Sequence, residues 1–258
     1  MIDLHAAALA GIAMAILALA GLVISMVKND VSLVDSLWSL FFLSGVLVYA
    51  ADVSVHEPRA ALVLVLVSLW ALRLAGYLTW RNWGEPEDRR YQSIRARHQP
   101  SFAWKSLYLI FGFQTLLAAL IVAPLFVALS SNGALNILDA AGLALWILGF
   151  GFETVGDWQL ARFKANPCNR AKVLDTGLWR YTRHPNYFGE AMLWWGYYLI
   201  AAAGGWWTVF APILMTILLL RVSGVTLLEQ DIHERRPRYR DYVARTNAFF
   251  PGRPKEAA

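Results

Sequence analysis

The stretch AAALAGIAMAILALAGLVISMV, residues 6–27, contains no charged side chain and decides the fold class. A bilayer core about 30 Å thick requires roughly 20 apolar residues in one helix, and this stretch meets that requirement. No basic segment precedes it, so we interpret it as a permanent membrane span and not as a cleaved signal peptide.

The remainder of the chain continues the same pattern. Hydrophobic residues make up 58% and charged residues 16%, whereas soluble domains have about 45–50% apolar and about 25% charged residues. We therefore expect an all-α integral membrane protein, formed as a single seven-helix domain over residues 1–258. The expected spans are about residues 6–27, 31–50, 60–80, 106–130, 138–158, 186–204 and 206–228.

The cationic residues predict the orientation of these spans. Nearly all lysines and arginines lie on alternate connections, and the opposite connections contain Arg59 alone. The positive-inside rule then places the amino terminus outside and the carboxyl terminus in the cytoplasm. We expect loops 81–105 and 159–185 and the tail 229–258 to form a cytoplasmic cap. The richness in alanine and the excess of arginine over lysine favour a bacterial inner membrane.

Ionisable side chains inside the expected spans gather near the cytoplasmic face. Such groups are costly in a bilayer, so each is a candidate for function. The alternative is a ring of interfacial charges that reach water. Residues four apart on a helix share a face, which predicts polar stripes on three spans. The ionisable residues are Asp35, Arg73, Glu153, Asp157, Glu190, Arg221 and Glu229, and the stripes are Arg73, Tyr77 and Arg81; Glu153 and Asp157; and Asn186 and Glu190.

Several common sites are missing from the sequence. No glycine-rich dinucleotide motif follows a strand pattern and no P-loop is present, so no Rossmann domain is expected. The single cysteine, Cys168, excludes an intramolecular disulfide, and the scattered histidines suggest no metal site. The basic loops would attract either a phosphate-bearing cofactor or anionic lipid head groups and do not discriminate between them. No nucleic-acid partner is expected.

Residues 175–190, Asp-Thr-Gly-Leu-Trp-Arg-Tyr-Thr-Arg-His-Pro-Asn-Tyr-Phe-Gly-Glu, resemble the signature of the membrane steroid 5α-reductase family, in its broad bacterial branch. Part of this segment, residues 183–189, is also similar to isoprenylcysteine carboxyl methyltransferases and phospholipid methyltransferases, which place S-adenosylmethionine at the equivalent bend. The similarity to the reductases continues in residues 82–85, 87–91, 163–167, 222–225 and 249–251.

The resemblance implies a membrane reductase that takes NADPH from the cytoplasm and reduces a C=C bond conjugated to a carbonyl. Its substrate would be a lipophilic small molecule from the bilayer, such as a steroid-like or lipid enone. By the resemblance, Asn186 and Glu190 hold the nicotinamide amide, which needs a donor and an acceptor on one face. The cofactor contacts it implies are Arg73, Tyr77, Asn82, Asp157, Lys164, Lys172, Tyr181, Arg183, His184, Asn186 and Glu190. An interfacial role for Arg183 and a loop-ordering role for His184 are the alternatives.

The second expected span departs from the family pattern. Steroid reductases place a Gln-Glu pair there to bind the substrate ketone, whereas this chain has Asp35 with Trp38 one turn on. A neutral Asp35 in apolar surroundings would donate a hydrogen bond to the ketone as the catalytic group. Trp38 and Trp70 are the expected substrate contacts. The alternative for Asp35 is an acidic residue favoured by the helix macrodipole.

Two other functions stay open. The first is an S-adenosylmethionine-dependent methyltransferase, although those families carry an acidic pair where this chain has Glu229 beside Gln230. The second is a non-catalytic lipid-binding membrane protein that keeps the fold.

Overall fold

The computed structural model describes residues 2–53, 55, 57–222 and 239–255, and every regular element within these ranges is a helix. The chain forms two compact units. Unit 1 consists of Met1–Asp139 and Ile200–Ala211, and unit 2 of Ala140–Leu199 and Pro212–Ala258. The predicted single domain with a cap of loops and tail stays a prediction.

Six helical stretches of the described chain are long and apolar enough to cross a membrane. They confirm the predicted class, an all-helical membrane protein that crosses the bilayer several times. The count of seven spans and their orientation stay predictions. The six stretches are Leu4–Lys28, Leu33–Val53, Pro58–Asn82, Phe102–Ile121, Ile137–Ala165 and Pro185–Arg221.

The last stretch contains a chain reversal. Helix α9 (Pro185–Gly205) is followed by the short 3-10 helix η4 (Trp206–Val209), helix α10 (Phe210–Ile217) and the π-helix η5 (Leu218–Val222). Trp195 Nε1 donates to Thr216 Oγ1 at 3.3 Å, whereas a continuous helix would separate the two residues by about 30 Å. The expected seventh span, 206–228, is therefore a return segment that is described as far as Val222. Glu229 and Gln230 lie outside the described residues.

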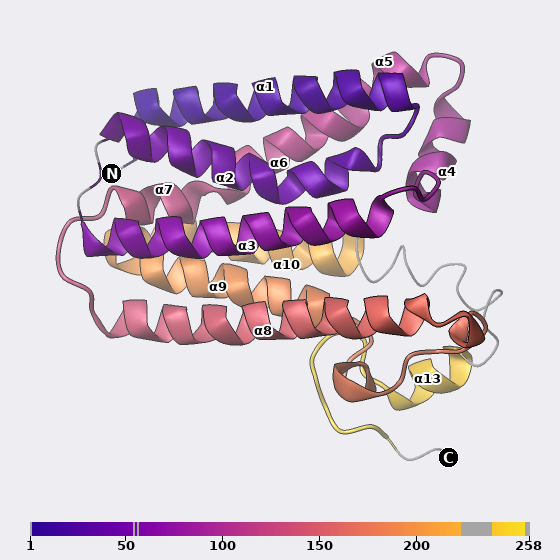
Figure 1. Cartoon of the computed structure of the whole chain (residues 1–258). Coiled ribbons are helices and arrows are strands. Elements are labelled where there is room, and N and C mark those ends of the chain that lie inside the picture. The colour runs from indigo at the N-terminus through magenta and orange to yellow at the C-terminus, as the bar shows by residue number, and fades with distance from the viewer. Residues whose placement is uncertain (1, 54, 56, 223–238, 256–258) are drawn as a thin grey trace. The chain divides into compact units, whose positions relative to one another are not determined.

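In unit 1 the first three helices pack side by side (Figure 1). Helix α1 (Leu4–Lys28) begins where the Asp3 carboxylate accepts from Ala6 N, and it ends at Asn29, which takes a left-handed conformation with φ of 53°. Helix α2 (Leu33–Val53) follows a short connection. Helix α3 (Pro58–Asn82) has proline in its first turn, where the missing N–H costs no helical bond.

The fourth expected span, residues 106–130, is broken in the structure. It starts earlier, with α5 (Phe102–Ser106), passes through the π-helix η1 (Leu107–Gly112) and continues as α6 (Phe113–Ile121). A separate helix, α7 (Ala123–Leu129), has Pro124 in its first turn. Proline cannot donate to the preceding turn, so one helix ends and another begins here.

A buried ion pair closes the end of unit 1 at which α3 begins. Arg59 donates to both carboxylate oxygens of Asp139, at 2.7 and 2.9 Å, and to the carbonyl of Ala134 at 3.1 Å. Both side chains of the ion pair are almost completely buried, with 2% and 3% exposed. Asp139 also accepts from Asn136 N, so the pair fixes the loop that precedes α8.

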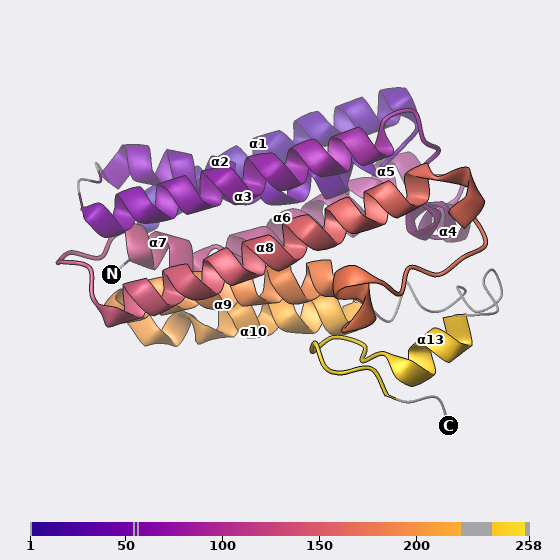
Figure 2. The ribbon, with the colours of Figure 1, turned by 60° about the horizontal axis from the view of Figure 1, so that its bottom comes forward.

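In unit 2 helix α8 (Ile137–Ala165) continues beyond the expected end of the fifth span at 158. Glu153 and Asp157 therefore lie well inside the helix, and not at its end as predicted. Figure 2 shows the chain leaving α8 through short helical turns, η2 (Pro167–Asn169) and η3 (Gly177–Arg180), before it enters α9.

Helices α8 and α9 touch along a row of glycines, which we call the glycine seam. On α8 the seam residues Gly142, Gly149 and Gly156 recur every seven positions, and Gly189 and Gly196 face them from α9. A methyl group added to Gly149 would lie 2.6 Å from the carbonyl oxygen of Gly189, and one added to Gly196 would lie 2.7 Å from that of Gly142. Small residues that let backbones approach are the usual basis of helix packing in membranes.

The tail returns to the start of α9 (Figure 2). Helix α13 (Tyr239–Arg245) places Tyr242, whose hydroxyl donates to the carbonyl of Trp179. Thr182 Oγ1 donates to the carbonyl of Phe249 at 2.8 Å. The loop before α9 and the tail are therefore joined by side-chain to backbone hydrogen bonds.

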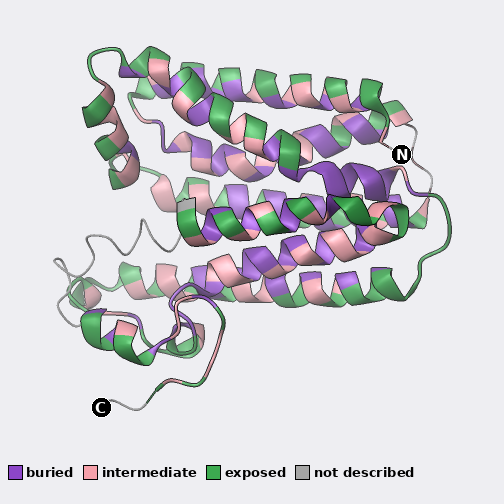
Figure 3. Ribbon diagram, turned by 180° about the vertical axis from the view of Figure 1, so that it is seen from behind, coloured by how far each residue is buried: buried purple, intermediate pink, exposed green. Residues whose placement is uncertain are grey.

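Buried and exposed residues alternate along the long helices (Figure 3). On α1 the exposed side chains include Ile12, Ile16, Leu19 and Val23, whereas Ala10, Met14 and Ala18 are buried. Exposed aliphatic side chains at this density suit a lipid-facing surface and not an aqueous one.

Candidate functional site

The carboxylate of Asp35, in the first turn of α2, is the centre of a polar cluster in unit 1. Its Oδ1 accepts from the hydroxyl of Tyr91 at 2.5 Å, and its Oδ2 accepts from Nη2 of Arg90 at 2.7 Å. Both donors belong to helix α4 (Arg89–His98), which lies in the connection after α3. Gln114 Nε2 approaches the Tyr91 hydroxyl at 3.4 Å from α6, directly after the π-helix η1.

Capping interactions hold α4 against the start of α2. Asp88 is the N-cap of α4 and accepts from Arg90 N, and its own backbone N donates to Ser32 Oγ at 2.8 Å. Glu87 accepts from Val31 N at 3.0 Å. These hydrogen bonds join the residues before α4 to the residues before α2, so the side chains of Arg90 and Tyr91 contact Asp35 in a defined geometry.

The environment of α4 changes the acid–base properties of its residues. Burial and the nearby charge of Asp35 raise the pKa of Tyr91 well above its ordinary value, so the phenol keeps its proton. Burial opposes the charge on Arg90, but the negative charge of Asp35 outweighs this effect together with other contacts and raises its pKa. At Asp88, burial opposes ionisation, yet hydrogen bonds from Arg90 lower its pKa overall.

The surroundings of Asp35 differ from those expected. We expected apolar surroundings to keep Asp35 neutral so that it could donate a hydrogen bond. In the structure, Arg90 and Tyr91 donate to its two oxygens. A carboxyl group in these contacts acts as an acceptor. Tyr91 supplies the hydroxyl donor of the cluster, and the catalytic role of Asp35 stays a prediction.

An aromatic row leads from this cluster into unit 1. Trp38, one turn after Asp35, meets Phe42 edge-on at 5.2 Å between ring centroids, and Phe42 contacts Trp70 of α3 at 5.7 Å. Trp70 is completely buried. The two predicted substrate contacts, Trp38 and Trp70, therefore belong to one continuous apolar surface beside the polar cluster.

The predicted cofactor residues of unit 1 lie along α3. Arg73 and Tyr77 are one turn apart and half-buried. The Tyr77 ring meets Trp80 at 6.2 Å and the guanidinium of Arg81 at 5.9 Å. Asn82 ends the helix and accepts from Arg81 Nε at 3.0 Å.

The predicted nicotinamide contacts lie in unit 2. Asn186 donates its amide to Asp157 Oδ1 at 3.1 Å, so these residues of α9 and α8 meet as the polar stripes predicted. Glu190, one turn after Asn186, is buried. A carboxamide presents N–H donors and a carbonyl acceptor, and an amide beside two carboxylates offers partners for both. The donor set therefore fits a nicotinamide.

The other predicted cofactor residues of unit 2 have varied surroundings. Lys164, Lys172 and Tyr181 are exposed near the end of α8 and in the following loop. Arg183 is buried and donates from Nη1 to the carbonyl of Thr246 at 2.8 Å, so it holds the tail. His184 is buried and stacks on Tyr187 with 5.6 Å between ring centroids. These contacts are structural, and the cofactor roles of Arg183 and His184 stay predictions.

The structure thus forms two groups of candidate residues, one in each unit. Asp35, Trp38 and Trp70 lie together in unit 1, and Asp157, Asn186 and Glu190 lie together in unit 2. Residues 87–91 belong to the segments that resemble the reductases, but no functional role was predicted for Tyr91 or Arg90. The available signal was an aspartate, Asp88, with cap character before a tyrosine in a polar loop, but no spacing rule links that loop to α2.

Most of the chain matches a known protein family. A family described as "Protein of unknown function (DUF1295)" matches residues 21–246, which contain both groups of candidate residues. An uncharacterised protein of Schizosaccharomyces pombe is 26% identical over 258 aligned residues, covering 88% of this chain and 74% of the relative. No solved structure matches the chain.

Proposed function

Because the chain belongs to the DUF1295 family of proteins of unknown function, which includes proteins similar to steroid 5α-reductases, we propose that it is a membrane reductase. The proposed reaction is the NADPH-dependent reduction of a C=C bond conjugated to a carbonyl in a lipophilic substrate. The observation that carries this proposal is the buried hydroxyl of Tyr91 held by Asp35 beside the aromatic row.

In this proposal Tyr91 polarises the substrate carbonyl. Its hydroxyl donates a hydrogen bond to the carbonyl oxygen in place of Asp35, whose carboxylate keeps its ion pair with Arg90. NADPH, when bound, would supply the hydride for the β-carbon. Tyr91 would stabilise the negative charge that develops on the carbonyl oxygen, and the α-carbon would take a proton from water. Before the substrate binds, the carboxylate of Asp35 holds the Tyr91 hydroxyl in position, and Trp38 lines the path of the apolar body.

Asn186 and Glu190 are the proposed nicotinamide contacts. Asp157 fixes the orientation of the Asn186 amide through its hydrogen bond. Lys164 and Lys172 of the same unit are proposed contacts to the ribose and phosphates, and such roles for Arg73, Tyr77 and Asn82 of unit 1 stay predictions. We further propose that this site opens to the cytoplasm, as the positive-inside rule predicts for the arginine-rich connections.

The test is ligand-dependent thermal stability of the detergent-purified protein. A ligand that binds only the folded state raises the melting temperature as its concentration passes the dissociation constant. We expect NADPH to raise it, Glu190→Gln to remove most of this rise, and Glu85→Gln, a change at an exposed loop residue, to leave the rise intact. A rise with S-adenosylmethionine and none with NADPH would replace the reductase by the methyltransferase alternative.

A further inference from the structure

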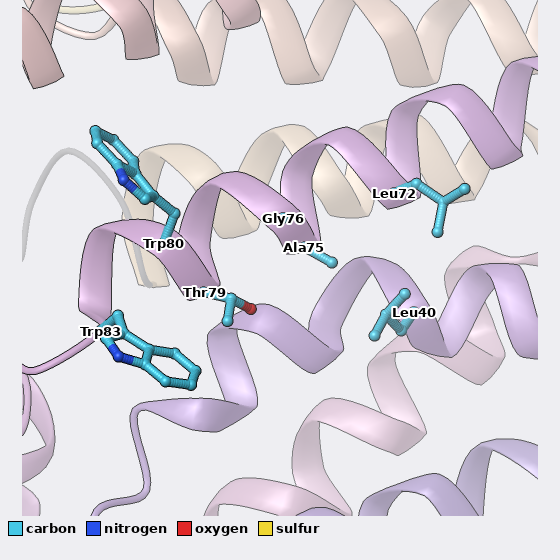
Figure 4. Close-up of a pocket in the computed structure, with 7 residues that line it drawn as sticks. All are labelled: Leu40, Leu72, Ala75, Gly76, Thr79, Trp80 and Trp83. Carbon is cyan, nitrogen blue, oxygen red and sulfur yellow. The ribbon is translucent and has the colours of Figure 1, made fainter.

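A groove runs along the outside of unit 1 between α2 and α3. It encloses about 670 Å³ and is lined by Leu40 of α2 and by residues of α3, the latter spaced three or four apart and hence on one helix face. Figure 4 shows the side chains of Thr79 and Ala75 on the side of α3 that is next to α2. Leu40 of α2 lies near them. On this side the groove is lined by Leu72, Ala75, Gly76, Thr79 and Trp80 of α3 and by Trp83, the residue that follows the helix.

The groove has the chemistry of a site for a hydrocarbon chain. Its walls are aliphatic and aromatic, with one hydroxyl from Thr79. Gly76 forms a gap in the wall, because a methyl group added there would meet no atom within 4 Å. Leu72 is 61% exposed, so this face of α3 is open to the surroundings of the protein. A lipid chain from the bilayer can therefore lie in the groove without a change in helix packing.

A cation stands at one end of the groove. Lys28, the last residue of α1, holds its ammonium group 5.6 Å from the ring centre of Trp83. Trp83 is 77% exposed at the end of α3, as is typical of tryptophans at the membrane–water boundary. Of the nearby carboxylates, Asp30 accepts from Ser32 N and Glu87 is paired with Arg95. The side chain of Lys28 is exposed, so its ammonium group is accessible to an anionic group at this end of the groove.

We propose that this groove binds one anionic phospholipid, with an acyl chain along Leu40 and Gly76 and its phosphate at Lys28. An apolar floor ending in a tryptophan and a lysine matches the order of groups in such a lipid, which has a hydrocarbon chain, an interfacial ester and a negative phosphate. A zwitterionic lipid would fill the same floor but place a positive choline beside Lys28. The site is independent of the proposed reductase activity.

Native mass spectrometry of the full chain tests this proposal. The delipidated protein receives equal amounts of phosphatidylglycerol and phosphatidylcholine with the same acyl chains. We expect one phosphatidylglycerol on the wild type, and at least ~10-fold weaker retention by Gly76→Leu, equivalent to about 1.4 kcal/mol of binding free energy. Gly11→Leu is the matched control, because a methyl group at Gly11 on α1 also meets no atom within 4 Å. We expect Lys28→Gln to keep one lipid but to lose the preference for phosphatidylglycerol.

A second measurement locates the bound lipid without a substitution that fills the groove. Phosphatidylglycerol with brominated chains quenches the fluorescence of tryptophans that it contacts. We expect Trp83→Phe to remove part of the quenched emission and Trp104→Phe, a change of another exposed tryptophan, to leave the quenched part intact. The proposal would be overturned by equal retention of both lipids by the wild type or by unchanged retention in Gly76→Leu. It would also be overturned if Trp83→Phe left the quenched part of the emission unchanged.

Discussion

Tyr91 of α4 donates its hydroxyl hydrogen to the carboxylate of Asp35 in α2, with 2.5 Å between the oxygens, although 56 positions separate the two residues in sequence. The bond joins a loop helix to the first turn of a membrane helix. Charge-assisted bonds of this length are stronger than bonds between neutral groups, so the pair positions a proton donor at the end of the aromatic row.

Replacement of Tyr91 by phenylalanine should reduce catalysis and leave cofactor binding unchanged. Removal of one hydrogen-bond donor to a developing oxyanion lowers kcat by about 100-fold or more, so we expect a loss of kcat of this size with the enone that the wild type reduces best. NADPH oxidation at 340 nm measures the rate, and the thermal shift with NADPH measures binding. A Tyr91→Phe variant with wild-type kcat would remove Tyr91 from the reaction.

The raised pKa of Tyr91 predicts a pH dependence of stability. Folding favours the protonated phenol, so its contribution is complete below the ordinary tyrosine pKa of about 10. As the pH rises above this value, unfolded chains ionise first, and the contribution is lost as the pH approaches the raised pKa of the folded state. Melting temperatures measured above pH 10 should therefore fall less steeply in Tyr91→Phe than in the wild type. Parallel curves would contradict the assignment.

The ion pair of Arg59 and Asp139 should be sensitive to the loss of one partner. Asp139→Asn or Arg59→Met leaves one buried charge without compensation, and such changes cost about 3–5 kcal/mol. The double change Arg59→Met with Asp139→Leu should recover much of this loss, because no charge then remains buried. Unfolding in detergent measures the differences, with Arg89→Met, a change at an exposed arginine, as the control. A double variant less stable than both single variants would refute this account.

The glycine seam should reject even a methyl group. Gly149→Ala would place a methyl carbon 2.6 Å from a backbone oxygen, and overpacking of this kind costs about 1–3 kcal/mol. Gly151→Ala lies on the same helix, but its methyl group meets no atom within 4 Å, so its stability should stay within about 1 kcal/mol of the wild type. Thermal unfolding compares the two variants. Equal losses would show that the seam is not a close contact.

The sequence predicted the membrane helices well because each depends on local composition. The span over residues 6–27 corresponds to α1. The ion pair of Arg59 could not be predicted, because its partner Asp139 is 80 positions away in sequence. The helix break follows from Pro124, and the extension of α8 to Ala165 follows from a run of helix-forming residues. Neither was predicted, because the expected spans were based on the length of the apolar stretches.

The candidate site was predicted only where its residues share a helix or a stripe. The spacing placed Asn186 and Glu190 on one face of a helix and Glu153 and Asp157 on one face of another, and the hydrogen bond between Asn186 and Asp157 joins the two faces. Tyr91 could not be found in this way, because its partner Asp35 is distant in sequence and the contact depends on how α4 docks. The seven-residue spacing of Gly149 and Gly156 indicates helix packing, but the partner glycines on α9 could be identified only from the structure.

The glycine seam also has a mechanical consequence. Two helices whose backbones interlock at every second turn resist sliding past each other by any smaller step, so α8 and α9 move as a single rigid hairpin. Asp157 on one helix and Asn186 on the other are thereby preorganised, since their relative position is set when the hairpin folds and not when a ligand arrives. A motion that opens this end of unit 2 must therefore bend or tilt the whole hairpin.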